Sequence, residues 1–427
     1  MNDKKPLGFW SVVSIGMGGM IGGGIFAVLG LAVQLSGGGT PVAFALGGII
    51  ALLTSYSYAR LSLTLPGIGG TVEYLNRAFG TGIVVGGLNI LLWLSYIVML
   101  SLYAYAFGSY GASFFSEHQI LWKHVLITLI VVVLTIMNAF STKLVGEAEE
   151  FIVAFKVTIL LIFVIAGIWS VNTNRLFGNF PSTMSIISGG MIIFLAYEGF
   201  ELIANTSGDV KNPEKIPLAY YVTVIFVMVL YVMIAIVTVG NLPIENIISA
   251  EDYALAASAR PFLGEAGFVL IAIAALFSTS SAINATLYGA ARVSYITAKE
   301  GELPEFLEHK VWNRPVEGLI ISSMLTLLIS NLFDLSSISV MGSAGFLLIF
   351  LAVNLANFRL YKITRSRRWI SLSGATGCAI ALVILIYNSA RFSASNPAIL
   401  IAMFTTSFAL EYIYRKFTKR EISLSEI

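Results

Sequence analysis

The sequence predicts an all-α integral membrane protein with twelve transmembrane helices, and composition, hydropathy and recurring apolar segments lead to this fold class. Of its 427 residues, 57% are hydrophobic and 11% are charged, whereas soluble domains carry about 25% charged residues. Mean hydropathy is +0.87. Apolar segments of the roughly 20 residues that cross about 30 Å of hydrocarbon recur to the end of the chain. The N-terminus lacks the short apolar run and cleavage site of a secretory signal, so a secreted protein is excluded.

The predicted spans cover residues 9–34, 41–65, 82–112, 122–140, 144–170, 185–207, 217–240, 264–298, 317–334, 336–361, 369–389 and 395–415. Twelve spans place both termini on one side of the membrane. That side carries most of the Lys and Arg residues, including the runs RSRR and RKFTKR, whereas the other side receives Lys123, Arg175, Arg260 and Arg391. Because Lys and Arg concentrate in cytoplasmic loops, both termini are predicted to be cytoplasmic. The basic runs are therefore topology anchors, and the net charge of +2 gives no reason to expect a nucleic-acid partner.

The first span contains three consecutive glycines, Gly22, Gly23 and Gly24, in an apolar segment. Each glycine inside a helix costs roughly 1 kcal/mol relative to alanine, so the run favours an unwound backbone. At membrane depth such backbone is tolerated only where it is buried or lines a cavity. The alternative is close helix packing, because Gly18 and Gly22, and likewise Gly19 and Gly23, have the G-x-x-x-G spacing.

The fifth span carries a lysine, Lys156, six residues beyond Glu150, or about 9 Å at 1.5 Å per residue. A lysine at that depth either extends its amine to the cytoplasmic interface or is buried inside the bundle. Burial disfavours the charged amine, which makes Lys156 a candidate proton carrier.

The sixth span repeats the features of the first, with Gly189 and Gly190 followed by two carboxylates near its middle, Glu198 and Glu201. Carboxylates at this depth are strongly disfavoured unless they face a cavity, so at least one is expected to be functional. The alternative is that internal hydrogen bonds seal both.

Interrupted spans at positions one and six predict two halves of five spans each, because broken segments at corresponding places indicate a transporter's binding site. Five is odd, so the second half is inverted relative to the first. The predicted organisation is a first repeat at 1–171, a second at 184–361, accessory spans at 369–415 and a cytoplasmic tail at 416–427. Between spans seven and eight, the mildly acidic segment 241–264 is a candidate cover for the outer mouth.

The sequence offers little basis for an enzyme or for a bound metal or cofactor. The single cysteine, Cys378, lies in an apolar segment, and the three histidines, His118, His124 and His309, form no ligand cluster. An intramembrane enzyme needs a nucleophile with its base, or metal ligands, inside the membrane. Neither a catalytic residue nor a cofactor is therefore expected.

Five motifs resemble the amino acid-polyamine-organocation superfamily of secondary transporters. They are GGMIGGGIF in the first span, LPGIGGTVEYLNRAFG after the second, FLAYEGFE in the sixth, DVKNPEKIP behind it and GELPEFLEHKVW after the eighth. The closest resemblance is to archaeal and bacterial proton-coupled transporters of broad amino acid specificity. It implies a leucine-transporter-type fold with discontinuous helices one and six.

The resemblance also implies roles for individual residues. In these relatives a fifth-span lysine occupies the place where sodium binds in sodium-driven carriers, and Lys156 matches it; its implied partners are the Gly18 carbonyl and the Ser278 hydroxyl. Glu201 matches a position that is often acidic in exchangers of arginine, lysine and polyamines. The two acids Glu198 and Glu201 would either favour a cationic substrate or form a coupled carboxylate pair that carries a proton. The predicted proton-coupling residues are Lys156, Gly18, Ser278 and Glu201.

The same breaks suit an amphoteric substrate. Exposed N–H groups at the restart of the first helix favour a substrate carboxylate, and carbonyls freed at both breaks favour its ammonium group. The predicted substrate site comprises Met20, Ile21, Gly22, Gly23, Gly24, Phe194, Leu195, Ala196, Tyr197 and Glu198.

The predicted function is proton-coupled, alternating-access transport of amino acids across the cytoplasmic membrane, with the lipid bilayer as surroundings and a monomer or weak homo-oligomer as the assembly. The alternative is an exchanger of cationic amino acids or polyamines, in which Glu198 and Glu201 bind the extra positive charge. A sensor that binds without transport and a channel are further possibilities; flux and saturable counterflow distinguish them.

Overall fold

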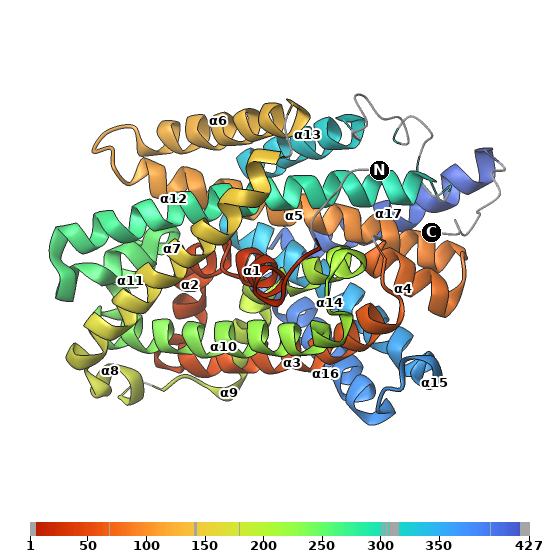
Figure 1. Ribbon diagram of the computed structural model, residues 1–427. Coiled ribbons are helices and arrows are strands. Elements are labelled where there is room, and N and C mark those ends of the chain that lie inside the picture. The colour runs from red at the N-terminus through yellow and green to blue at the C-terminus, as the bar shows by residue number, and fades with distance from the viewer. Residues whose placement is uncertain are drawn as a thin grey trace.

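A computed structural model describes residues 6–67, 69–140, 143–178, 180–299, 301, 303, 307, 316–392 and 394–418. The described chain is built from long helices, most of which run roughly along one common direction (Figure 1). Ten helical segments among these residues are long and apolar enough to cross a membrane, and Phe9–Met20 and Val316–Leu332 are shorter apolar helices. The prediction of an all-α, multi-pass membrane protein is confirmed.

Each predicted span coincides with one helix, except the first, which coincides with two helices, and the sixth, which coincides with three shorter ones. The first half contains α1 (Phe9–Met20), α2 (Gly24–Ser36), α3 (Thr40–Thr64), α4 (Gly70–Phe79), α5 (Ile83–Ala112), α6 (Gln119–Phe140), α7 (Lys143–Gly167) and the short α8 (Thr173–Phe177). Most of the GELPEFLEHKVW motif and most of the predicted tail at 416–427 lie outside the described residues.

The second half begins with α9 (Thr183–Ile192), which continues as two 3₁₀ helices, η3 (Ile193–Tyr197) and η4 (Phe200–Asp209). The remaining elements are η5 (Pro213–Lys215), α10 (Ile216–Asn241), α11 (Ile244–Ser249), η6 (Glu251–Tyr253), α12 (Ala254–Lys299), α13 (Val316–Leu332), α14 (Leu335–Arg359), α15 (Tyr361–Thr364), α16 (Arg368–Phe392) and α17 (Asn396–Thr418). A bend at Gly264, where φ is 65°, divides α12. The segment 241–264, which the sequence analysis places between spans seven and eight, is largely helical, because it contains α11, η6 and the first part of α12.

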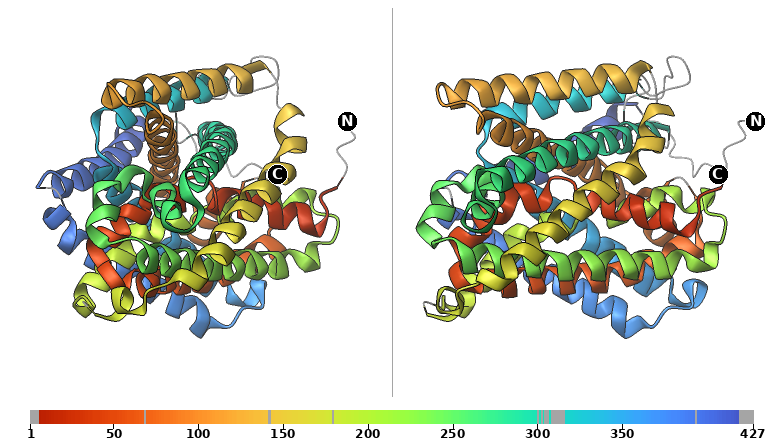
Figure 2. Two further views of the ribbon diagram at one scale, coloured as in Figure 1. Left: turned by 90° about the vertical axis from the view of Figure 1, so that its left-hand side faces the viewer. Right: turned by 60° about the vertical axis from the view of Figure 1, so that its left-hand side comes forward.

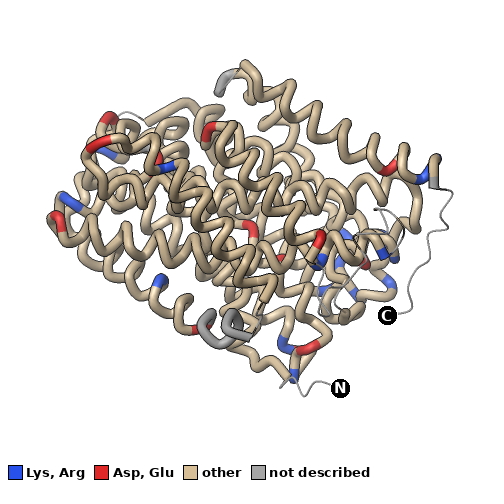
Figure 3. Tube along the Cα trace, turned by 90° about the horizontal axis from the view of Figure 1, so that it is seen from above, with Lys and Arg blue, Asp and Glu red and all other residues tan. Residues whose placement is uncertain are grey.

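The broken elements lie at the centre of the bundle. In Figures 1 and 2, α1 and α2 lie between the pair α3 and α10 on one side and α5 and α12 on the other. The charged residues gather mainly at the two ends of the bundle (Figure 3), as expected when the middle lies in hydrocarbon. At one end, a parallel bridge joins Leu7 to Val210, so the segment before α1 is tied to the segment after η4.

Candidate functional site

The break between α1 and α2 is held open by side chains from four other helices. A helix end leaves its last carbonyls without intrahelical donors. Here five successive carbonyls lie within hydrogen-bonding distance of donors from outside: Lys156 Nζ donates to Gly18 O (2.9 Å), Tyr103 Oη to Gly19 O (3.4 Å) and Tyr231 Oη to Met20 O (2.6 Å). The one hydroxyl proton of Ser278 is shared between Ile21 O (2.5 Å) and Gly22 O (2.6 Å). The donors come from α7, α5, α10 and α12, so the unwound backbone is satisfied by tertiary contacts.

The glycines of this break are also packing residues. A Cβ on Gly22 would lie 2.5 Å from the Cβ of Ala282, and one on Gly23 would overlap the ring of Tyr103. The two explanations considered for the glycine run are thus compatible: the backbone is unwound at 21–23, and neighbouring side chains approach it too closely for any residue but glycine.

The sixth span is interrupted in a similar way. Gly199 has a φ of 118°, in the left-handed region that favours glycine. Ser343 of α14 bridges the preceding turn, because its Oγ donates to Ile192 O (2.7 Å) and accepts from Leu195 N (3.2 Å). One oxygen of Glu201 accepts a hydrogen bond from Gly199 N (2.6 Å), so this carboxylate caps the start of η4.

The two breaks pack directly against each other. A Cβ on Gly199 would overlap the backbone of Gly19 and Met20, and a Cβ on Gly24 would lie 2.6 Å from the Cα of Ala196. Residues 196–199 therefore lie alongside residues 19–24. The structure brings the two predicted parts of the substrate site together at the centre of the bundle.

The individual residues of the predicted substrate site are all buried, but their polar groups are engaged to different extents. The carbonyls of Met20 and Ile21 already accept side-chain hydrogen bonds, and that of Leu195 accepts a backbone hydrogen bond from Glu198 N (3.2 Å). The hydroxyl of Tyr197 donates to Phe44 O on α3 (2.7 Å) rather than to the α1 break.

Lys156 is fully buried, with 0% of its surface exposed. Its amine donates to Gly18 O at the end of α1, so the alternative in which the side chain extends to the membrane interface is wrong. The residues implied as its partners lie around the same break, although Ser278 donates to the carbonyls of Ile21 and Gly22. Lys156 and Ser278 both link α1 to neighbouring helices.

Sequence analysis missed three residues of this site: Tyr103, Tyr231 and Ser343. A buried hydroxyl requires a hydrogen-bond partner, and an unwound helix provides carbonyls that require donors. The chain contains 18 tyrosines, however, and nothing in the sequence distinguishes the two that contact the break.

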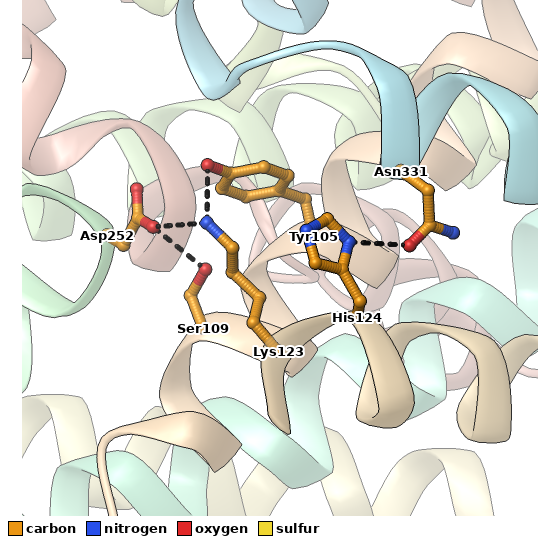
Figure 4. Close-up of polar contacts among 6 residues, drawn as sticks. All are labelled: Tyr105, Ser109, Lys123, His124, Asp252 and Asn331. Atoms are coloured by element: carbon orange, nitrogen blue, oxygen red, sulfur yellow. Dashed lines mark hydrogen bonds and ion pairs between the residues drawn. The ribbon is translucent and has the colours of Figure 1, made fainter. Parts of the chain in front are cut away.

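A second polar cluster lies away from the breaks and joins α5, α6 and η6 (Figure 4). Lys123 Nζ donates to Tyr105 Oη (2.9 Å) and to Asp252 Oδ2 (3.3 Å), and Ser109 Oγ donates to the same oxygen of Asp252 (3.1 Å). Nearby, His124 Nδ1 lies 2.8 Å from Asn331 Oδ1. Because η6 and α11 both pack on α2, the ion pair fixes the segment that covers one end of α2.

We expect Asp252→Asn to lower the thermal unfolding midpoint of the purified protein modestly. The side chains of Lys123 and Asp252 are 19% and 26% exposed, and a partly exposed pair contributes about 1 kcal/mol, or roughly 1–3 °C in a protein of this size. Glu265→Gln is the matched control, because it removes the more exposed ion pair with Arg260. A control variant that is destabilised as much as Asp252→Asn would contradict this prediction.

Comparison with known proteins identifies relatives over nearly the whole chain. Residues 7–409 match the family described as amino acid permease. The chain is 40% identical over 428 residues to the uncharacterized protein MJ0609 of Methanocaldococcus jannaschii, covering 98% of both proteins. It is 36% identical over 392 residues to the inner membrane transport protein YbaT of Escherichia coli, covering 91% of both. It is 28% identical over 354 residues to the serine/threonine exchanger SteT of Bacillus subtilis, covering 79% of this chain and 80% of that protein.

Proposed function

The chain belongs to the amino acid permease family, within the amino acid-polyamine-organocation superfamily, and from this premise we propose that it is a proton-coupled secondary transporter of amino acids that works by alternating access. Family membership makes it a membrane transporter of amino acids rather than an enzyme. Proton coupling, alternating access and the assignment of individual residues are the proposal. The observation that carries it is the burial of Lys156 against the break of α1.

The proposed substrate site is the strip where the two breaks meet. The first N–H groups of α2 have no intrahelical acceptors and lie at the positive end of its dipole. We assign the substrate carboxylate to the N–H groups at and just before the start of α2, at Gly23 and Gly24. Gly22, the third glycine predicted for this site, already donates its N–H to Gly19 O (3.2 Å). The substrate ammonium is assigned to the opposite side of the strip, formed by residues 194–198, whose proximity to residues 19–24 supports the assignment.

The proposed coupling step acts on the contacts between α1 and its neighbours. Tyr103 on α5 and Ser278 on α12 bind the break from helices of the proposed scaffold, and Lys156 binds it from α7. Spans one, two, six and seven would move against spans three, four, eight and nine. A protonated Lys156 bound to Gly18 O favours one access state, and deprotonation weakens that contact. A coupled ion must bind the two states with different affinities, and this contact supplies the difference.

The proposed topology follows the predicted repeats. Repeats at 1–171 and 184–361 would be related by inversion, with 369–415 as accessory spans and both termini in the cytoplasm. Their support is that each break falls in the first span of its repeat, as in transporters whose site lies at the repeat interface. The protein is proposed to lie in the cytoplasmic membrane as a monomer or weak homo-oligomer.

The first test is uptake of labelled alanine and arginine into sodium-free proteoliposomes, with and without an inside-alkaline pH gradient. We expect the gradient to drive accumulation of substrate above its external concentration. Uptake that ignores the gradient but requires internal amino acid would select an exchanger instead, the activity named for the Bacillus subtilis relative. Liposomes that contain the protein but take up no amino acid by either mode would contradict the proposed function.

A further inference from the structure

Glu198 and Glu201 are the two carboxylates at the sixth-span break, and they differ in their hydrogen bonds. Glu198 is 0% exposed, and within the described part of the chain neither of its carboxylate oxygens accepts a hydrogen bond. Its neighbour Glu201 has one oxygen bound to Gly199 N and one without such a partner. Glu201 thus holds the backbone of the break, whereas Glu198 has no comparable structural role.

An unpartnered buried carboxylate is costly, because it has lost its hydration without gaining a donor. Buried polar groups in proteins are hydrogen-bonded with few exceptions, and exceptions at functional sites indicate a missing partner. Lys156 directs its amine to Gly18 O. Across the residues that the structure describes, the salt bridges lie elsewhere: Lys123–Asp252, Arg260–Glu265 and Arg415–Glu411.

The backbone of Glu198 lies within the strip that forms the proposed substrate site. It lies between Ala196, which packs on Gly24, and Gly199, which packs on Gly19. The carbonyls of Gly18 through Gly22 on the other side of the strip already accept hydrogen bonds from side chains. Among the described residues of the two breaks, the carboxylate oxygens without a hydrogen-bond donor are both oxygens of Glu198 and one oxygen of Glu201, so Glu198 offers the larger acceptor capacity for a cation.

The charge balance of the site distinguishes two classes of substrate. A neutral amino acid brings one carboxylate and one ammonium group, so its complex avoids a net negative charge in a region of low dielectric only while Glu198 holds a proton. A substrate with a cationic side chain adds one positive charge, and its complex with an ionised Glu198 is then neutral. Buried charges are tolerated when they are paired in this way.

We propose that Glu198 makes this transporter selective for amino acids with a cationic side chain, by pairing with the ammonium or guanidinium group of that side chain. The inference rests on the proposed function, because it requires amino acid binding at the two breaks. It is independent of whether transport is symport or exchange.

The test measures counterflow of labelled arginine and labelled alanine at equal pH on both sides of the membrane, so that proton coupling does not enter. We expect the wild-type protein to prefer arginine, and we expect Glu198→Gln to reduce the arginine-to-alanine ratio at least about tenfold while alanine counterflow persists. Glu411→Gln is the matched control. Glu411 is also buried but forms an ion pair with Arg415 on α17, away from the breaks, so this variant should keep the wild-type ratio.

If a variant reconstitutes poorly into the vesicles, a binding measurement on the purified protein still tests the inference. Arginine should raise the thermal unfolding midpoint of the purified wild-type protein and of Glu411→Gln, but not that of Glu198→Gln. An unchanged ratio in Glu198→Gln, no arginine preference in the wild type, or loss of the preference in Glu201→Gln instead would each overturn the assignment. Alanine counterflow with an unchanged ratio would leave the proposed function standing, whereas absence of all amino acid counterflow would overturn both.

Discussion

A Lys156→Ala protein is expected to lose accumulation driven by a pH gradient while it continues to exchange substrate across the membrane. The amine of Lys156 is fully buried and donates to Gly18 O at 2.9 Å. A hydrogen bond to a charged group contributes roughly 1.5–3 kcal/mol, and about 1.4 kcal/mol corresponds to a factor of ten in an equilibrium. Gradient-driven accumulation should therefore fall at least about tenfold.

The measurement is uptake into proteoliposomes with an inside-alkaline gradient, compared with counterflow of the same substrate at equal pH. Counterflow reports whether the variant is folded and binds substrate, since it needs no coupling ion. Lys156→Met serves as a second variant that fills more of the space left by the lysine. Lys123→Ala is the matched lysine control, because Lys123 pairs with Asp252 in the other polar cluster and should keep its response to the gradient. A Lys156→Ala protein that still accumulates substrate when the gradient is applied would rule out lysine coupling.

Replacing Gly199 by alanine is expected to be the most damaging single-methyl change in the chain. Its φ of 118° disfavours any residue with a Cβ, at a cost of roughly 1–2 kcal/mol. The added carbon would also overlap the backbone of Gly19 and Met20, which cannot rotate away as a side chain can, and overpacking adds about 1–3 kcal/mol. We expect the purified variant to unfold several degrees below the wild type and transport to be lost, because the two breaks can no longer meet.

Substitutions at three other glycines separate the two causes of this destabilisation, backbone strain and steric overlap. Gly264→Ala introduces backbone strain alone, because φ there is 65° and no atom of the described residues lies within 4 Å of the added carbon. Gly24→Ala introduces a close contact alone, 2.6 Å from the Cα of Ala196, and Gly82→Ala introduces neither. The expected order of damage places Gly82→Ala last and Gly199→Ala first. A Gly199→Ala protein with the stability and transport of Gly82→Ala would show that the contact between the breaks is dispensable.

Fewer backbone carbonyls at the breaks are available to a substrate than the sequence predicts. The sequence predicts carbonyls at Met20 and Ile21 that are available to a substrate ammonium. In the structure these carbonyls accept hydrogen bonds from Tyr231 and Ser278. Glu201, predicted as a proton-coupling residue, also has a structural role as the acceptor for Gly199 N. Both findings favour Glu198 as the acceptor for a cationic ligand.

The sequence by itself determined the membrane class, the positions of the helices and the location of both breaks. These follow from local physics. Backbone groups in hydrocarbon must be hydrogen-bonded within each segment, so a spanning segment must be a helix, and its length and hydropathy can be recognised in its own sequence. Glycine runs and intramembrane carboxylates stand out for the same reason, since each is unfavourable where it occurs unless something compensates for it. The two breaks, at 20–24 and 193–199, could therefore be placed to within a few residues.

Only the tertiary structure decided what compensates for the breaks. The donors to residues 18–22 lie 84 to 257 positions away along the chain, on α5, α7, α10 and α12. Many serines and tyrosines in apolar segments are equivalent in sequence, and most hydroxyls can instead bond to their own helix, as Thr279 and Ser280 do. Lys156 has a partner in Gly18 O, whereas among the described residues the Glu198 carboxylate has none. This difference depends on which helices meet, and hydropathy along the chain does not specify that.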